Sequence, residues 1–176
     1  MAVSSSTASN VVVGAGDVFL DGTDVGATMD NNSFAVETEW YVPDLNGVPG
    51  ELKGTRYKSS ETVRLGTTVV ELTAAKLAAV LPNWESATVG TITTVDTDDT
   101  RRVSSASYHD WLLQVDGLDG VQYNFYADDA INDGGISMEA SDDGTMVLTA
   151  ELVATWDGSD MTTSPYRITR TTGVSS

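Results

Sequence analysis

Few side chains in this sequence could take part in acid–base or nucleophilic chemistry. His109 is the only histidine, and cysteine is absent. If residues 108–115 form a strand, Asp110 points away from the face that carries His109, so no neighbouring carboxylate would orient the imidazole. Glu37 and Glu39 would share one strand face, but no adjacent apolar pocket would separate their acidities. The sequence therefore predicts no enzymatic activity and no cofactor.

Aspartate-rich segments could instead gather oxygen ligands around a cation. The two candidates are Asp96-Thr97-Asp98-Asp99 and the group Asp128, Asp129, Asn132, Asp133 and Gly134. Neither has the glycine at position 6 and the glutamate at position 12 of an EF-hand loop. Because Asp, Asn and Gly are also common turn residues, we interpret both segments as polar turns and expect no metal site.

The charge balance is strongly acidic. The 176 residues include 26 acidic and 9 basic side chains, for a formal net charge of -17, and 18 of the 26 acids are aspartate. Such a surface is typical of salt-adapted proteins, although a merely acidic protein is the alternative. The charge opposes tight nucleic-acid binding, which depends on cations that neutralise phosphates. No long apolar run or basic leader is present, so we expect neither a membrane span nor a signal peptide.

The elements that must position these side chains are mainly strands. Val and Thr, which favour strands, supply 44 residues. Residues 33–41 alternate between two faces, one with Phe34, Val36, Thr38 and Trp40 and the other with Ala35, Glu37, Glu39 and Tyr41. Further strands are expected at residues 17–20, 61–71, 88–95, 108–115, 121–128 and 145–156. These patterns predict an antiparallel β-sandwich or barrel as a single domain over residues 11–172, with flexible ends at residues 1–10 and 173–176.

One short segment has a helical pattern. Thr73 is suited to cap a helix, alanines follow it, and Pro82 ends the pattern. Leu77, Val80 and Leu81 form one apolar stripe. We expect this helix to pack against the sheet edge or a neighbouring subunit.

The segment between residues 41 and 61 is expected to be the tip of a long hairpin. It contains two of the four prolines, and its return limb holds three of the nine cations, Lys53, Arg56 and Lys58. A tip of this length needs contacts outside its own hairpin if it is ordered. We therefore predict a docking element formed by Pro43, Asp44, Leu45, Asn46, Gly47, Val48, Pro49, Gly50 and Lys53.

The order of these parts resembles that of a known family. The stretches VVVGAGDVFLDGTDVGATMDN, SFAVETEWYVPDLNGVPGELKGT and ETVRLGTTVVELTAAKLAAVLPN follow one another across residues 11–83. Together they resemble the major tail tube proteins of long, noncontractile-tailed (siphovirus-like) viruses, and the acidity fits a halophilic host.

The resemblance implies a structural protein of the virion tail, assembled in the host cytoplasm. Subunits would form hexameric rings that stack into a tube for genome ejection, with the hairpin tip reaching the adjacent ring. Expected partners are further copies of the chain and the tail terminator, tape-measure and distal tail proteins, with viral DNA as passing cargo and no membrane. An acidic lumen would not hold DNA, and its candidate lining residues are Glu37, Glu39, Thr68, Thr149 and Glu151.

Two alternatives remain open from the sequence. The same polar face could lie on the outer surface of a tube. The chain could also be a β-sandwich binding module, such as a tail decoration, an adhesin or a Ca²⁺-dependent recognition domain.

Overall fold

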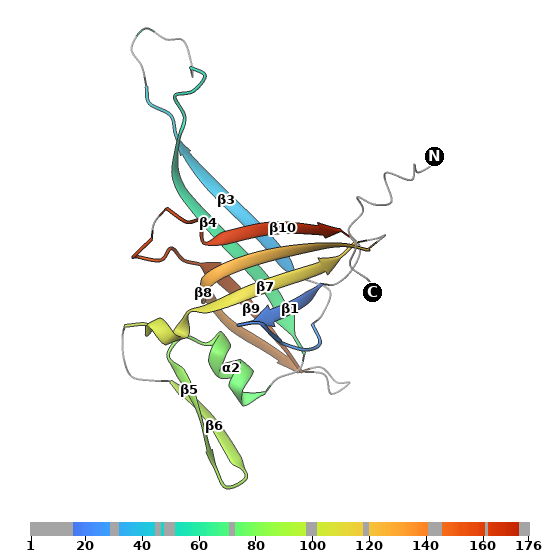
Figure 1. Ribbon diagram of the computed structural model, residues 1–176. Helices are drawn as coiled ribbons and strands as arrows, with labels where there is room; N and C mark the ends of the chain where they lie inside the picture. The colour runs from blue at the N-terminus through green and yellow to red at the C-terminus, as the bar shows by residue number, and fades with distance from the viewer. Residues whose placement is uncertain are drawn as a thin grey trace.

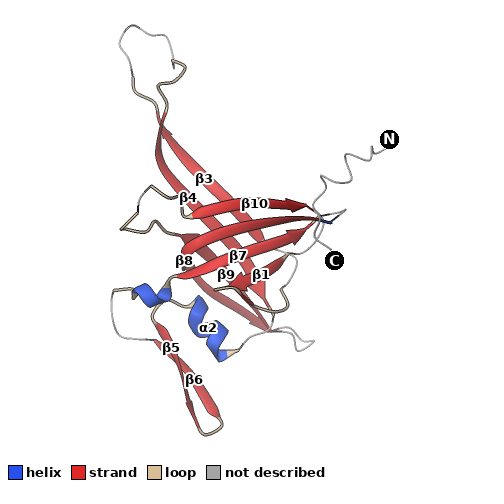
Figure 2. Ribbon diagram, in the orientation of Figure 1, coloured by secondary structure: helices blue, strands red, loops and turns tan. Residues whose placement is uncertain are grey.

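Over the residues that the structure describes, the fold is a curled antiparallel sheet with one α-helix and two projecting hairpins (Figure 1). The computed structural model describes residues 16–28, 32–44, 47, 52–70, 73–97, 102–117, 120–140, 146–160 and 162–172. The predicted terminal arms, residues 1–10 and 173–176, lie outside these ranges. The expected fold class, mainly β with one flanking helix, is confirmed (Figure 2).

The described elements follow one another along the chain in a simple order. They are β1 (Asp17–Leu20), β2 (Thr23–Asp24), β3 (Ser33–Tyr41), β4 (Tyr57–Val69), α2 (Ala74–Val80), β5 (Trp84–Val89), β6 (Ile92–Thr97), a 3₁₀ turn (Ser105–Ser107), β7 (His109–Asp116), β8 (Val121–Ala140), β9 (Met146–Ala154) and β10 (Tyr166–Thr172).

The main sheet is organised around β8. The strand order is β2-β1-β7-β8-β9-β4-β3, and β10 also pairs with β8. The first part of β8 pairs with β7 and β10, and its second part pairs with β9. Among the described strands, β3 pairs only with β4 and β10 only with β8, so each leaves one edge without a strand partner.

The core lies on the concave side of this curled sheet. Strands β4 and β9 each present alternate residues to it, and the largest fully buried side chains are Trp111, Leu65, Leu148, Leu152, Val18, Val63 and Thr67. The Phe34 ring on β3 lies 5.3 Å from the Phe125 ring on β8 and 6.5 Å from the Tyr166 ring on β10. These contacts hold β3 across β8 and β10, which encloses the core without a second, separate sheet.

Helix α2 closes one end of the core. The Thr73 hydroxyl accepts a hydrogen bond from the Lys76 backbone N–H at 3.2 Å, as an N-cap does. Val80 and Leu81 are buried, and Leu77 is partly buried against the core cluster. Lys76 Nζ donates a hydrogen bond to the Val25 carbonyl. The helix is therefore fixed to the body both by its apolar face and by this lysine.

The structure differs from the sequence prediction at residues 88–95. Instead of one strand, the chain forms the β5–β6 hairpin, in which Val89 pairs with Ile92 across a two-residue turn. Gly90 has a φ of 66°, a left-handed conformation that glycine adopts at little cost. The prediction was wrong because Gly90, a lone glycine among β-branched residues, turns the chain back on itself instead of continuing the strand.

The second difference concerns the Asp128–Gly134 region, which was predicted to be a polar turn. It lies inside β8, where Asp129 has a φ of 47° and the register shifts between Asn132 and Ile136. The strand therefore accommodates turn-type residues as local irregularities, with paired neighbours on both sides. Strand β10 was also missed, and β4 begins earlier than the predicted residue 61.

Candidate functional site

The first candidate surface is the polar face of β3, β4 and β9 on the side opposite the core. Directly paired residues of antiparallel strands share a face. The register pairs Glu37 with Thr62, Gly66 with Glu151, and Thr68 with Thr149. The structure therefore brings all five predicted lining residues, Glu37, Glu39, Thr68, Thr149 and Glu151, onto one face, which we call the polar sheet face.

Arg64 organises the charges of the polar sheet face. Its Nη1 lies 2.7 Å from Glu151 Oε1, and its Nε lies 4.0 Å from Glu37 Oε2. Glu39 instead accepts a hydrogen bond from the Ser60 hydroxyl at 2.7 Å. Two carboxylates, those of Glu37 and Glu151, thus share one guanidinium, and the Glu39 carboxylate forms no contact with it. The face therefore stays acidic although two of its acids are partly neutralised.

The middle of the polar sheet face is smooth because its side chains are small. A shallow hollow there is lined by Ser33, Ala35, Arg64, Gly66, Thr67, Thr68, Thr149, Ala150 and Glu151. A Cβ atom at Gly66 would lie 2.7 Å from the Ser33 hydroxyl, so a larger residue there would force the Ser33 side chain to move. The Thr68 and Thr149 hydroxyls lie 3.3 Å apart and link β4 to β9. The surface offers short hydroxyls and carboxylates rather than an enclosed pocket.

The second candidate surface is the tip of the β3–β4 hairpin, which projects from the body (Figure 1). Three large aromatic side chains are exposed where the hairpin leaves the body, Trp40 at 52%, Tyr41 at 60% and Tyr57 at 61%. The Arg56 guanidinium carbon lies 5.9 Å from the Trp40 ring centre. Exposed aromatic groups beside cations are typical of protein interfaces.

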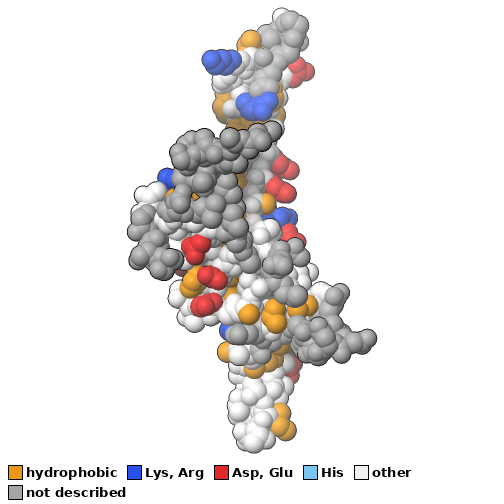
Figure 3. Space-filling model, turned by 90° about the vertical axis from the view of Figure 1, so that its right-hand side faces the viewer, with side chains coloured by type: hydrophobic (Ala, Val, Ile, Leu, Met, Phe, Trp, Pro, Cys, Tyr) orange, Lys and Arg blue, Asp and Glu red, His pale blue; other side chains and the backbone are white. Residues whose placement is uncertain are grey.

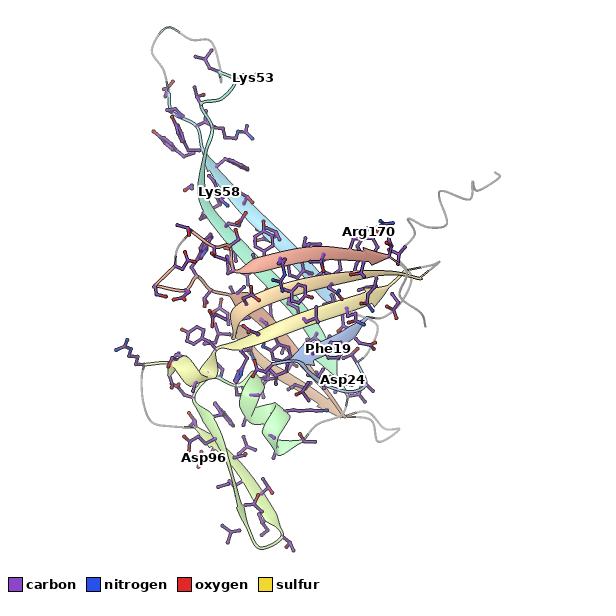
Figure 4. The ribbon with its side chains drawn as sticks, viewed as in Figure 1. Phe19, Asp24, Lys53, Lys58, Asp96 and Arg170 are labelled. Atoms are coloured by element: carbon purple, nitrogen blue, oxygen red, sulfur yellow. The ribbon has the colours of Figure 1, made fainter. Side chains whose placement is uncertain are left out.

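The structure describes only part of the predicted docking element. Pro43, Asp44, Gly47 and Lys53 are described. Leu45, Asn46, Val48, Pro49 and Gly50 lie outside the described residues. Lys53 and Lys58 lie near the projecting end in Figure 4, and Lys58 Nζ is 2.9 Å from Glu61 Oε2. Figure 3 shows Lys and Arg side chains gathered at the same end.

A third surface, the β5–β6 hairpin, was not predicted from the sequence. It projects from the opposite end of the molecule, next to α2 (Figure 1). Val89 is 81% exposed and Ile92 is 69% exposed at its tip. The only local signal for it was Gly90, which starts the turn.

His109 does find a carboxylate, but from a distant segment. Its Nδ1 lies 2.8 Å from Asp21 Oδ2, in the turn between β1 and β2. Asp21 Oδ1 also accepts the Asp110 backbone N–H at 2.9 Å. The expectation from the sequence considered only the sequence neighbours of His109, whereas this carboxylate comes from a segment 88 residues away. Asp21 fastens the β1–β2 turn to β7 through these two contacts.

Three aspartates have perturbed pKa values, and for one of them, Asp157, hydrogen bonds from Ser159 lower the pKa. Burial raises the pKa of Asp128, and the nearby Asp110 carboxylate adds to this effect. Hydrogen bonds from Thr162 and Thr163 lower the pKa of Asp160 to about 2. Within the described ranges, no group of three or more His, Cys, Asp or Glu side chains could hold a metal ion.

No helix among the described residues is long and apolar enough to cross a membrane.

The candidate surfaces are two projecting hairpins and one polar sheet face, which together suit contacts with large partners better than binding of a small molecule. No protein-family model and no curated protein sequence matches this chain.

Proposed function

We propose that this protein is the structural subunit of a viral tail tube, in which hexameric rings stack to form the conduit for genome ejection. The observation that carries the proposal is the pair of hairpins that project from opposite ends of the curled sheet (Figure 1). A subunit with different binding surfaces at its two ends forms contacts that need not close, and such contacts generate filaments.

The edges of the sheet support lateral assembly. Strand β3 has nine residues and pairs only with β4 among the described strands, and β10 pairs only with β8. Long unpaired edges tend to join other strands, so proteins usually protect them. On the inner side of β10, Ile168 is 52% exposed although it pairs with Phe125, which is partly buried against the core cluster. Joining of sheets between neighbouring subunits in a ring would satisfy the edges and cover this side chain.

The polar sheet face supports a lumen-lining role. In the proposed tube it would present carboxylates and short hydroxyls to passing DNA, and Arg64 would be held by Glu37 and Glu151. A cation that is already paired with carboxylates is less available to phosphates. The face would therefore repel DNA without holding it.

Electron microscopy tests the proposed assembly directly. Purified full-length protein, examined by negative staining over a range of NaCl concentrations, should show rings or tubes. A variant that lacks residues 44–53, with the hairpin closed by a short turn, should remain folded by circular dichroism but form no tubes. Wild-type protein that remains monomeric at every salt concentration would contradict the proposal and favour the binding-module alternative.

A second experiment tests the lumen. Glu37, Glu39 and Glu151 are replaced together by Lys, and a matched variant carries Gln at the same positions. Tubes of the Lys variant assembled with duplex DNA should retain DNA that is protected from nuclease, whereas the Gln and wild-type tubes should retain much less. Retained DNA that stays sensitive to nuclease would instead place this face on the outside of the tube.

A further inference from the structure

The β5–β6 hairpin is unusual because neither of its faces is covered. All six residues of β5 and five of the six in β6 are exposed. Its main neighbour in the fold is α2, at its base. Two-stranded hairpins are at best marginally stable in water unless something packs against them. This one therefore has the properties of an element that is completed by a partner.

One face of the hairpin has a graded composition from base to tip. The register places Glu85 opposite Asp96, Ala87 opposite Thr94, and Val89 opposite Ile92. We call these six residues the receiving face. The side chains of this face are acidic at the base of the hairpin, small in its middle and apolar at its tip. A shallow hollow lies over its lower part, lined by Glu85, Ala87, Thr94, Asp96 and Thr97.

Among the described residues, no cation pairs with the acidic base of the receiving face. Like charges directly opposite one another destabilise a strand pair. Neither Glu85 nor Asp96 forms an ion pair within the part of the chain that the structure describes, and Asp96 accepts only the adjacent Thr97 N–H at 2.8 Å. A cation supplied from outside the hairpin would remove this repulsion.

Groups of the complementary kind lie at the far end of the same molecule. The tip of the β3–β4 hairpin carries Lys53 and Arg56 beside the exposed rings of Trp40 and Tyr57. Figure 4 shows Lys53 at one end of the molecule and Asp96 at the base of the hairpin at the other end. The two surfaces cannot meet within one subunit, so only another copy can bring them together.

We propose that the receiving face of one copy binds the β3–β4 tip of a second copy. Lys53 and Arg56 of the tip face Glu85 and Asp96, while Val89 and Ile92 pack against the exposed aromatic rings. The inference rests on the proposed tube function and identifies the surface of the adjacent ring that holds the hairpin tip. The contact is head-to-tail, so repeating it stacks rings in one direction.

A charge exchange tests the ion pairs. Glu85→Lys with Asp96→Lys should abolish stacking, as should Lys53→Glu with Arg56→Glu, and all four changes in one chain should restore it. Lys58 is left unchanged so that its ion pair with Glu61 within the hairpin is kept. A control that replaces the exposed Asp17 and Asp133 with Lys changes the net charge as much as the first variant does, and it should still assemble.

A disulfide cross-link tests the contact independently. The chain has no cysteine, so any disulfide comes from introduced residues. Tubes that carry both Leu52→Cys and Val89→Cys should give, after oxidation, a ladder of covalent oligomers on a denaturing gel. Either substitution alone can link at most two chains, so it should give no species larger than a dimer.

The outcomes separate this inference from the function on which it rests. Restored stacking and a cross-linked ladder would support the contact. The contact would be overturned, and the tube function would stand, if the wild-type protein forms tubes while the double-cysteine variant gives no ladder and the charge changes leave assembly unaffected. A wild-type protein that never assembles would overturn both.

Discussion

Two valines provide a matched test of which surfaces are buried in the single subunit. Val80 on α2 is 3% exposed and belongs to the core cluster, whereas Val89 at the tip of the β5–β6 hairpin is 81% exposed. The same substitution, Val→Ala, removes the same two methyl groups at each position. Any difference between the variants therefore reports on the environment and not on the chemistry of the change.

The expected loss at Val80 follows from its burial. Two buried methyl groups contribute about 1.6 kcal/mol at about 0.8 kcal/mol each, and incomplete collapse of the site adds a cavity cost. The better helix propensity of alanine offsets about 0.5 kcal/mol of this loss in unfolding free energy. A net loss of about 1.5 to 2 kcal/mol should lower Tm by about 3 to 8 °C in a protein of this size.

The expected effect at Val89 is different in kind. An exposed side chain contributes little to the stability of the free subunit, so Val89→Ala should change it by no more than about 0.5 kcal/mol. Because the proposed contact buries Val89, the rings formed by the Val89→Ala variant should nevertheless stack more weakly. Thermal melts followed by circular dichroism on unassembled protein, at one fixed NaCl concentration, measure the first effect, since assembly would itself raise Tm. Sedimentation of assembled material measures the second.

Two results would refute this reasoning. An unchanged Tm for Val80→Ala would mean that the helix does not pack on the core as the structure has it. An equally large loss of Tm for Val89→Ala would mean that the β5–β6 hairpin is covered within the single subunit. The hairpin would then have no exposed apolar tip for a partner to bind.

Three further predictions concern charge and packing. Leu77→Asp should prevent folding or assembly, because Leu77 packs against the core and a carboxylate there would lose water without gaining a partner; soluble, normally assembling protein would show that this face is free. If the acidity is a salt adaptation, Tm should rise steeply from tenths of molar to molar NaCl, because the screening length shrinks from about 10 Å to about 3 Å; a flat melting series would contradict that explanation. The raised pKa of Asp128 means that its charged form is disfavoured in the fold, so the destabilisation is present above that pKa and disappears as pH falls through it. Asp128→Asn should therefore raise Tm at pH 7 but not in acid, whereas Asp133→Asn, at an exposed position of the same strand, should have a smaller effect at pH 7.

Local patterns in the sequence were enough to predict the class of fold and several of its elements. Alternation in residues 33–41 indicated a strand with one apolar face, and the structure shows it as β3. The Thr73 cap and Pro82 bounded the helix correctly within a residue or two. These features depend on contacts between residues close in sequence, so they can be read from the chain directly.

The grouping of the predicted lining residues could be predicted only where the residues are close in sequence. Glu37 and Glu39 share a face simply because they are two residues apart on a strand. Their grouping with Thr149 and Glu151 depends on β4 lying between β3 and β9, a pairing that spans more than 80 residues of sequence. The polarity of each residue was visible in the sequence, but the shared surface was not.

The sequence by itself determined that this chain is acidic and rich in strands, that it has one capped helix, and that it has a long hairpin tip between residues 41 and 61. Only the tertiary structure decided that β8 continues through its Asp-rich segment, that Asp21 reaches His109, and that the two hairpins project from opposite ends. The physical reason is that strand pairing and side-chain contacts between distant segments can override local turn preference. In β8, a bulge accommodates the turn-type residues, and the paired residues on both sides of it stabilise the strand.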